Sequence, residues 1–141
     1  MPVATGNHVA ATMADGRIIA VGGSDQTGTV LITKTQIYDP ATSSWSLGAD
    51  QPVVHASYAG IAATPCGPVY VWGGILSTPG IKSVSAYDPS TDTWSVLDDL
   101  PFFAGGGAYG RFYDGQYIWA SGRDNTAMTA KTYLSAAPIV E

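Results

Sequence analysis

Tyr87-Asp88-Pro89-Ser90-Thr91-Asp92-Thr93-Trp94 is the stretch of sequence that decides the fold, because the chain contains a near copy of it. The copy is Tyr38-Asp39-Pro40-Ala41-Thr42-Ser43-Ser44-Trp45, and its tyrosine and tryptophan lie 49 residues before their counterparts. An apolar run that ends in two glycines precedes each copy, at 18–23 and at 69–74. Self-similarity at a period of about 40–50 residues indicates a repeat architecture.

The residue types of this octet predict a β-hairpin with an aromatic side chain on each strand. Tyr87 followed by Asp88-Pro89 ends a strand, since proline cannot donate a ladder hydrogen bond and restricts the residue before it to extended geometry. Aspartate, serine and threonine then bond to the local backbone and build the turn. Trp94 resumes an extended run with a large apolar surface. The preceding glycine pair marks a strand end where the backbone bends or another group approaches closely.

This combination resembles the kelch repeat, in which an apolar strand ends in Gly-Gly and is followed by Tyr, Asp-Pro and Trp. The matching residues are Gly22, Gly23, Tyr38, Asp39, Pro40 and Trp45 in one copy, and Gly73, Gly74, Tyr87, Asp88, Pro89 and Trp94 in the next. The resemblance implies an all-β fold in which each repeat forms one four-stranded blade of a kelch-type β-propeller. The Gly-His and Trp-Asp dipeptides of the other common propeller repeat do not occur.

The repeat predicts a single domain of about three blades, at 1–50, 51–99 and 100–141. The third copy has diverged: its glycine pair is reduced to Ser121-Gly122, and its final tryptophan is missing. Tyr133 is expected at the position of Tyr38 and Tyr87. Residues 138–141 are expected to form a short fourth strand.

The first strand of each expected blade is rich in small residues. They are Ala10, Ala11, Ala59, Gly60, Ala62, Ala63, Gly107, Ala108 and Gly110. The innermost strands of a propeller crowd its central axis, so small residues suit that place.

Three blades do not close a ring, because propellers typically use four to eight. An open arc exposes two apolar end faces, and patches of that kind exceed what soluble monomers normally expose. We therefore expect self-association as a homodimer, in which two copies complete a six-bladed ring. The competing interpretation is that the chain is a fragment of a longer propeller.

The composition narrows the range of partners and locations. The net charge is −5 with only six lysines and arginines, so no basic surface is expected for nucleic acid. The N-terminal residues do not form a signal peptide, and no apolar run approaches the ~18 residues of a membrane span. The sequence therefore predicts no membrane partner and slightly favours the cytoplasm. Cys66 is the single cysteine, so no internal disulfide can form.

In a four-stranded propeller the links between blades and the loops after the second strands lie at one end of the channel. We expect ligand contacts there. The main candidates are Asn7, His8, Asp25, His55, Tyr58, Arg123 and Asp124, with Thr5, Gln26, Ser57, Phe102, Phe103 and Asn125 nearby. Such a concave polar and aromatic mouth suits a small polar ligand or a peptide.

No catalytic motif, metal-ligand spacing or cofactor motif is found, so no catalytic residue, metal or cofactor is predicted. The leading hypothesis is a non-catalytic binding or scaffold module with a protein or glycan ligand at the channel mouth. A second hypothesis is an enzyme acting on a sugar-like small molecule, as in some kelch-family propellers, with His8, His55, Arg123 and Asp124 as its polar groups. A third is a structural fragment or a reconstructed propeller without a ligand. Fold alone does not decide between them.

Overall fold

The computed structural model describes residues 1–55, 59–65, 67–75, 80–101 and 103–104 with their side chains, and the backbone of three further strands within 109–134. The described residues form β-strands joined by turns and loops, and the expected all-β fold with four-stranded blades is confirmed. The strands are β1 (Val9–Thr12), β2 (Ile18–Val21), β3 (Thr35–Asp39), β4 (Ser44–Gly48), β5 (Gly60–Ala63), β6 (Val69–Trp72), β7 (Val84–Asp88), β8 (Thr93–Leu97), β9 (Tyr109–Tyr113), β10 (Gln116–Ala120) and β11 (Thr132–Leu134). No helix with the length and apolar character of a membrane span occurs in the described part of the chain.

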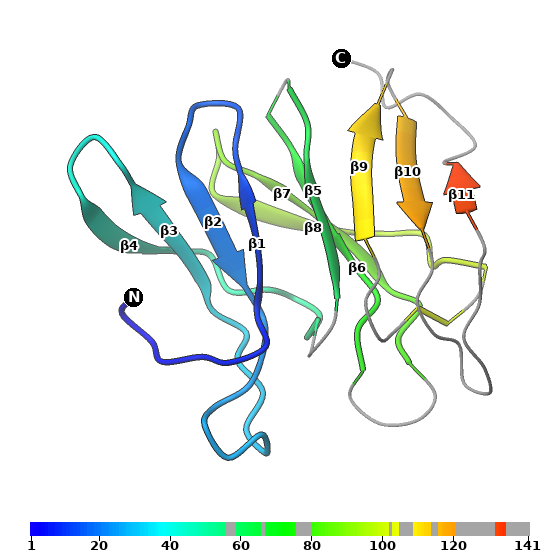
Figure 1. Ribbon diagram of the computed structural model, residues 1–141, viewed down its shortest axis with the longest axis horizontal. Coiled ribbons are helices and arrows are strands. Elements are labelled where there is room, and N and C mark those ends of the chain that lie inside the picture. The colour runs from blue at the N-terminus through cyan, green and yellow to red at the C-terminus, as the bar shows by residue number, and fades with distance from the viewer. Residues whose placement is uncertain are drawn as a thin grey trace.

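The strands form three antiparallel sheets, which we call blades 1, 2 and 3. Blades 1 and 2 have four strands each, in the orders β1-β2-β3-β4 and β5-β6-β7-β8. Blade 3 has three described strands, in the order β11-β10-β9. The first strands β1, β5 and β9 lie side by side, and Figure 1 shows the rest of each sheet running outward from them. This is the arrangement expected of the innermost strands of a propeller.

The register of blade 3 corrects one expectation. Thr35 pairs with Val21, directly before the first glycine pair, and Thr132 pairs with Ala120, directly before Ser121-Gly122. Thr132 is therefore the counterpart of Thr35, and Tyr133 is the counterpart of Gln36 rather than of Tyr38. The connection from Gly122 to Thr132 has the same length as that from Gly74 to Val84 in blade 2, so Tyr133 comes two residues before the position that matches Tyr87. The expected fourth strand at 138–141 lies outside the described residues.

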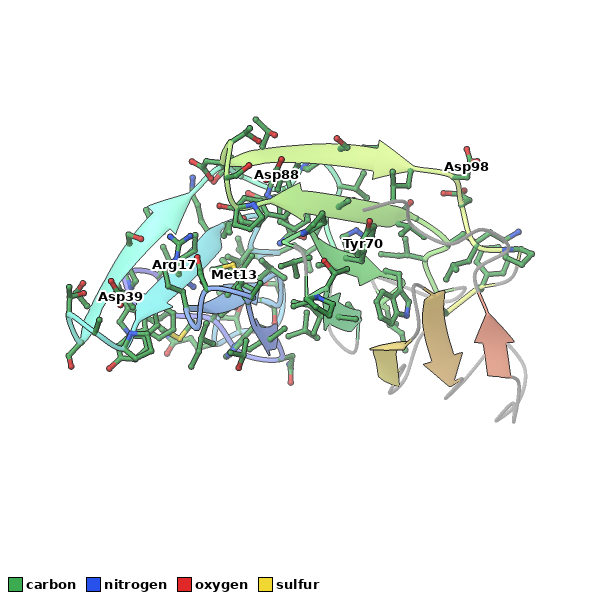
Figure 2. All side chains as sticks on the ribbon, turned by 90° about the horizontal axis from the view of Figure 1, so that it is seen from above. Met13, Arg17, Asp39, Tyr70, Asp88 and Asp98 are labelled. Atoms are coloured by element: carbon green, nitrogen blue, oxygen red, sulfur yellow. The ribbon has the colours of Figure 1, made fainter. Side chains whose placement is uncertain are left out.

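The core is built between blades, not within them. Residues alternate along β6, so Val69 and Val71 face blade 1 and Tyr70 and Trp72 face the other way. The first core cluster comprises Met13, Ile19, Val21 and Ile37 from blade 1, and Ala59, Val69, Val71 and Tyr87 from blade 2. Figure 2 shows Met13 between the two sheets and Tyr70 on the far side of the second. Each sheet is therefore buried on a given face only when a neighbouring blade covers that face.

The hairpin formed by β7 and β8 adds hydrogen bonds at the outer edge of the contact between blades 1 and 2. The indole nitrogen Nε1 of Trp94 donates to Thr35 Oγ1 at 3.1 Å and to the carbonyl oxygen of Ala49 at 3.0 Å, both across the interface. Oδ1 of Asp92 accepts from the Tyr87 hydroxyl and from the Ala49 backbone nitrogen, each at 2.8 Å. Burial and the bond to Asp92 raise the pKa of Tyr87, so its hydroxyl stays protonated and donates.

The two motif tryptophans are less buried than the repeat predicts. Tyr87 is only 1% exposed, whereas Trp94 is half-buried because its ring lies at the outer edge of the interface. In blade 1 both Tyr38 and Trp45 are half-buried, since no blade precedes them in the described chain. We expected Trp45 and Trp94 to be largely buried between blades, and this expectation is wrong: the fully buried ring of the motif is that of Tyr87, which has a neighbouring blade.

Trp94→Ala should lower the free energy of unfolding by about 3–5 kcal/mol, because it empties an aromatic site between two blades. Trp94→Phe should cost about 0.5–1.5 kcal/mol, since it keeps a ring and loses the shared N–H. Denaturant unfolding at one protein concentration measures both. Val96→Ala is the control: Val96 lies on the same strand and is 57% exposed, so the change should stay within about 0.5 kcal/mol. A loss below about 1 kcal/mol for Trp94→Ala would contradict this account of the interface.

Candidate functional site

The links between blades and the loops after the second strands meet at one end of the molecule, which we call the loop end. Gly6, in the link before β1, forms an antiparallel bridge with Ser24 after β2. Ala104, in the link before β9, does the same with Ile81 before β7. This end lies at the bottom of Figure 1, where the β2–β3 connection and the described parts of the β6–β7 connection, 73–75 and 80–83, extend below the sheets. The expected convergence of links and loops is therefore present.

The glycine pairs make this convergence sterically feasible. Gly22, Gly23 and Gly73 have φ angles of 72°, 84° and 64°, in the left-handed region that disfavours other residues. A side-chain carbon on Gly22 would overlap the carbonyl oxygen of His55, in the link to the next blade. One on Gly23 would overlap the carbonyl oxygen of Gly6, in the link to its own blade. The absence of a side chain at Gly22 thus leaves room for the link to blade 2, and its absence at Gly23 leaves room for the link that leads into blade 1.

His55 is a buried structural residue and not part of an accessible mouth. Its residue exposure is 0%, and Nδ1 lies 3.1 Å from the carbonyl oxygen of Gly73 while Nε2 lies 3.0 Å from Ser85 Oγ. Because a carbonyl only accepts, Nδ1 carries the proton, and Nε2 accepts from the serine hydroxyl. The prediction of His55 at an open rim is wrong for this reason: the ring serves to join its link to β6 and β7.

Blade 1 has a different pair of residues at the corresponding positions. Gly6 and Gln36 lie 49 residues before His55 and Ser85. Gly6 has no side chain, and the longer Gln36, which is 1% exposed, reaches the link and accepts from the backbone nitrogen of Val3 at 2.9 Å. Sequence reasoning missed both Gln36 and Ser85, although the 49-residue step relates them.

Asp25 holds a loop together. We call residues 25–30 the Asp25 loop. Its carboxylate accepts from the Thr27 hydroxyl at 2.8 and 2.9 Å and from the backbone nitrogens of Thr29 and Val30 at 3.2 Å. The bond from Thr27 contributes most to lowering the pKa of Asp25, and the backbone donors act in the same direction. The carboxylate is thus ionised at neutral pH and engaged within its own loop.

The remaining candidate ligand-contact residues lie partly within and partly outside the described part of the chain. Asn7 is exposed with a left-handed φ of 56°, and His8 is half-buried. Within the described residues Nδ1 of His8 has no hydrogen-bond partner. Thr5 donates to the carbonyl oxygen of Gly22 at 2.9 Å, which is a structural role. Tyr58, Arg123 and Asp124 lie outside the described residues, as do Ser57, Phe102 and Asn125.

Two apolar side chains at the loop end were not singled out from the sequence. Val30 is 57% exposed and Leu31 is 37% exposed. The loop after β2 reads as polar when only Ser24 to Gly28 is considered, so the apolar pair that follows escaped notice. Gln26 beside them is also exposed, as expected. No group of three or more metal-ligating side chains occurs among the described residues.

Comparison with known proteins agrees with this architecture. The kelch motif matches residues 6–52 and 62–101, more than half of the chain, so the chain belongs to the kelch-motif family. The fold is similar to that of a fungal alcohol oxidase of the AA5 family, in complex with copper, with a TM-score of 0.72 at 15% identity over 89% of this chain and 29% of that one. It is also similar to YjhT, with a TM-score of 0.70 at 15% identity over 85% of this chain and 44% of that one. The chain thus spans less than half the length of these structures. No curated protein matches it.

Burial of His55 should make stability depend on pH. Desolvation lowers the pKa of His55 from 6.5, against the opposing effect of the Gly73 carbonyl. A lowered pKa means that the unfolded chain binds the proton more readily, so this stability is present above pH ~6.5 and is lost as the pH falls below it. The free energy of unfolding should fall by up to about 1.4 kcal/mol per pH unit from this group.

Denaturant unfolding between pH 7.5 and 5 measures the effect in the native chain and in His55→Asn, whose amide can still donate to Gly73. Both proteins keep His8, so the difference between their slopes reports His55 alone. An unchanged slope in the variant would contradict the assignment.

Proposed function

We propose that this chain is a non-catalytic binding module of the kelch propeller type, whose recognition surface lies at the loop end of blade 1 and takes a segment of another protein. The observation that carries the proposal is an exposed apolar pair, Val30 and Leu31, on an ordered loop. Exposed apolar side chains of this kind supply binding energy when a partner covers them.

The order of the Asp25 loop favours binding because little conformational entropy remains to be lost. Asp25 donates its backbone N–H to the carbonyl oxygen of Val30 at 2.8 Å, and Gly28 donates to the carbonyl oxygen of Asp25 at 3.0 Å. Leu31 forms a bridge with Ser24, which is itself bridged to Gly6. The apolar pair is therefore attached to the propeller through three adjoining backbone segments.

Polar groups suited to a peptide backbone adjoin this pair. Asn7 and Gln26 are both exposed, and their side-chain amides offer donors and acceptors. Asn7 follows Gly6 directly, so it lies next to the same set of bridges. An apolar centre with polar groups around it is the usual composition of a protein-binding surface.

The described titratable groups with shifted pKa values support binding rather than catalysis as the function of this end. The shift at Asp25 arises from its own loop, and that at His55 arises from burial. A glycan ligand remains compatible with the amides of Asn7 and Gln26. Likeness to a copper-bound alcohol oxidase at 15% identity concerns the fold, so an enzyme acting on a sugar-like molecule is the second outcome that the experiment must distinguish.

The experiment selects peptides from a random display library on the immobilised chain and measures their affinity in solution. Val30→Ser with Leu31→Ser should weaken the selected peptides about tenfold or more, since two exposed apolar contacts are removed. Val96→Ser is the matched control, because Val96 is also 57% exposed but lies on the outer strand β8. Its affinity should stay unchanged.

Equal affinity in all three proteins, or equal loss in both variants, would contradict the proposed surface. A glycan array and a sugar-turnover assay run in parallel test the two other ligand classes. Binding or turnover of sugars without any peptide binding would overturn the proposal in favour of those alternatives.

A further inference from the structure

Blade 1 carries a complete half of a blade-to-blade contact on the side that faces away from blade 2, which we call the open face. Its Tyr38 and Trp45 rings lie 5.2 Å apart at 45°, and the Tyr87 and Trp94 rings of blade 2 lie 5.1 Å apart at 43°. The second pair packs on a preceding blade and the first does not. The aromatic arrangement of the open face is thus formed before any partner is present.

The polar atoms of the open face lack the hydrogen bonds that the corresponding atoms of blade 2 form with blade 1. Trp94 Nε1 has two acceptors in blade 1, Thr35 Oγ1 and the Ala49 carbonyl. In the part of the chain that the structure describes, neither Trp45 Nε1 nor the Tyr38 hydroxyl forms a hydrogen bond. Ile18, the counterpart of the fully buried Val69, is half-buried.

Not every exposed apolar residue of blade 1 belongs to this face. Leu47 on β4 is 51% exposed. Its counterpart Val96, 49 residues later, is 57% exposed although it lies on the blade whose interface is filled. The exposure of Leu47 therefore does not mark a contact, and this residue serves as a control below.

The contact between blades 1 and 2 defines the kind of partner that the open face accepts. Trp94 binds a threonine at the start of a third strand, opposite the residue that precedes the glycine pair. Register puts Thr35, Val84 and Thr132 at this position in blades 1, 2 and 3. Of these three residues only the two threonines have a hydroxyl that can accept a hydrogen bond. The hydroxyl of Thr35 already accepts one from Trp94 of blade 2. Thr132 on β11 is the remaining match within this sequence.

We propose that the open face of one chain binds blade 3 of a second copy, so that Trp45 of each copy meets Thr132 of the other. A two-fold arrangement forms both contacts at once and joins two three-bladed arcs into one closed ring. Closure also covers the open face of blade 1, which no other described blade covers. The proposal does not depend on the ligand surface described above.

The first measurement is the mass in solution. Light scattering across micromolar concentrations should give about twice the 14.6 kDa of one chain. Trp45→Ala should raise the dimer dissociation constant more than 100-fold, since each dimer loses two aromatic contacts, one at each of its two interfaces. Leu47→Ser should leave the constant unchanged. Far-UV circular dichroism confirms that each variant keeps its strands.

A double-mutant cycle identifies the partner residue. Trp45→Phe removes the indole N–H, Thr132→Val removes the hydroxyl, and each alone should weaken the dimer roughly tenfold. If the two groups bond to one another, the combined variant should be no weaker than either single one. Trp94→Phe with Thr35→Val, measured by unfolding, is the reference for the bond that the structure contains at 3.1 Å.

Three results would overturn the proposal. A stable monomer would mean that another occupant covers the open face. A dimer that tolerates Trp45→Ala would use a different surface. Additive losses from Trp45→Phe and Thr132→Val would mean that the two residues do not meet.

Discussion

Burial of one blade against the next is the interaction on which the rest of this structure depends. A blade is a thin sheet whose two faces are both apolar along its second strand, as β6 shows with Val69 and Val71 on one side and Tyr70 and Trp72 on the other. Neither face can be satisfied within the blade. The hydrophobic free energy of the fold is therefore released only when blades stack, and the polar contacts of Trp94 and Asp92 fix the angle and register of the stack.

The links between blades must cross this stack without separating the sheets, and the glycine pairs permit the crossing. Gly22 and Gly23 lie between an outgoing and an incoming segment, and neither place has room for a side chain. The loop end inherits its order from that crossing, since the same backbone that passes the glycines continues into the bridges at Ser24 and Ile81. The described part of this end is accordingly held together by backbone hydrogen bonds between links and loops.

The 49-residue step in the sequence was sufficient to predict the all-β fold, the blades and the meeting of links and loops. It could do so because strand ends and turns depend on the local preferences of glycine, proline and aspartate, which can be read from a single sequence. It could not reveal that His55 is buried, since the residue that covers a histidine is set by packing between distant segments. The sequence also did not show that Asp25, a candidate ligand contact, bonds within its own loop, because such a carboxylate looks the same in sequence as one that binds a ligand. Tyr133 was misplaced by two positions, since it was matched by residue type although its spacing from the glycines is two residues shorter than that of Tyr87.

The different bonds between link and third strand in blades 1 and 2 have a consequence for how such a chain can be rearranged. In blade 1 Gln36 accepts from the Val3 nitrogen of its link, and in blade 2 Ser85 bonds His55 of its link. Exchanging a whole blade together with its own link keeps these bonds intact. A crossover between the link and the third strand would instead separate each third-strand residue from the link that it binds. The sequence of each blade therefore carries its link as part of the same unit.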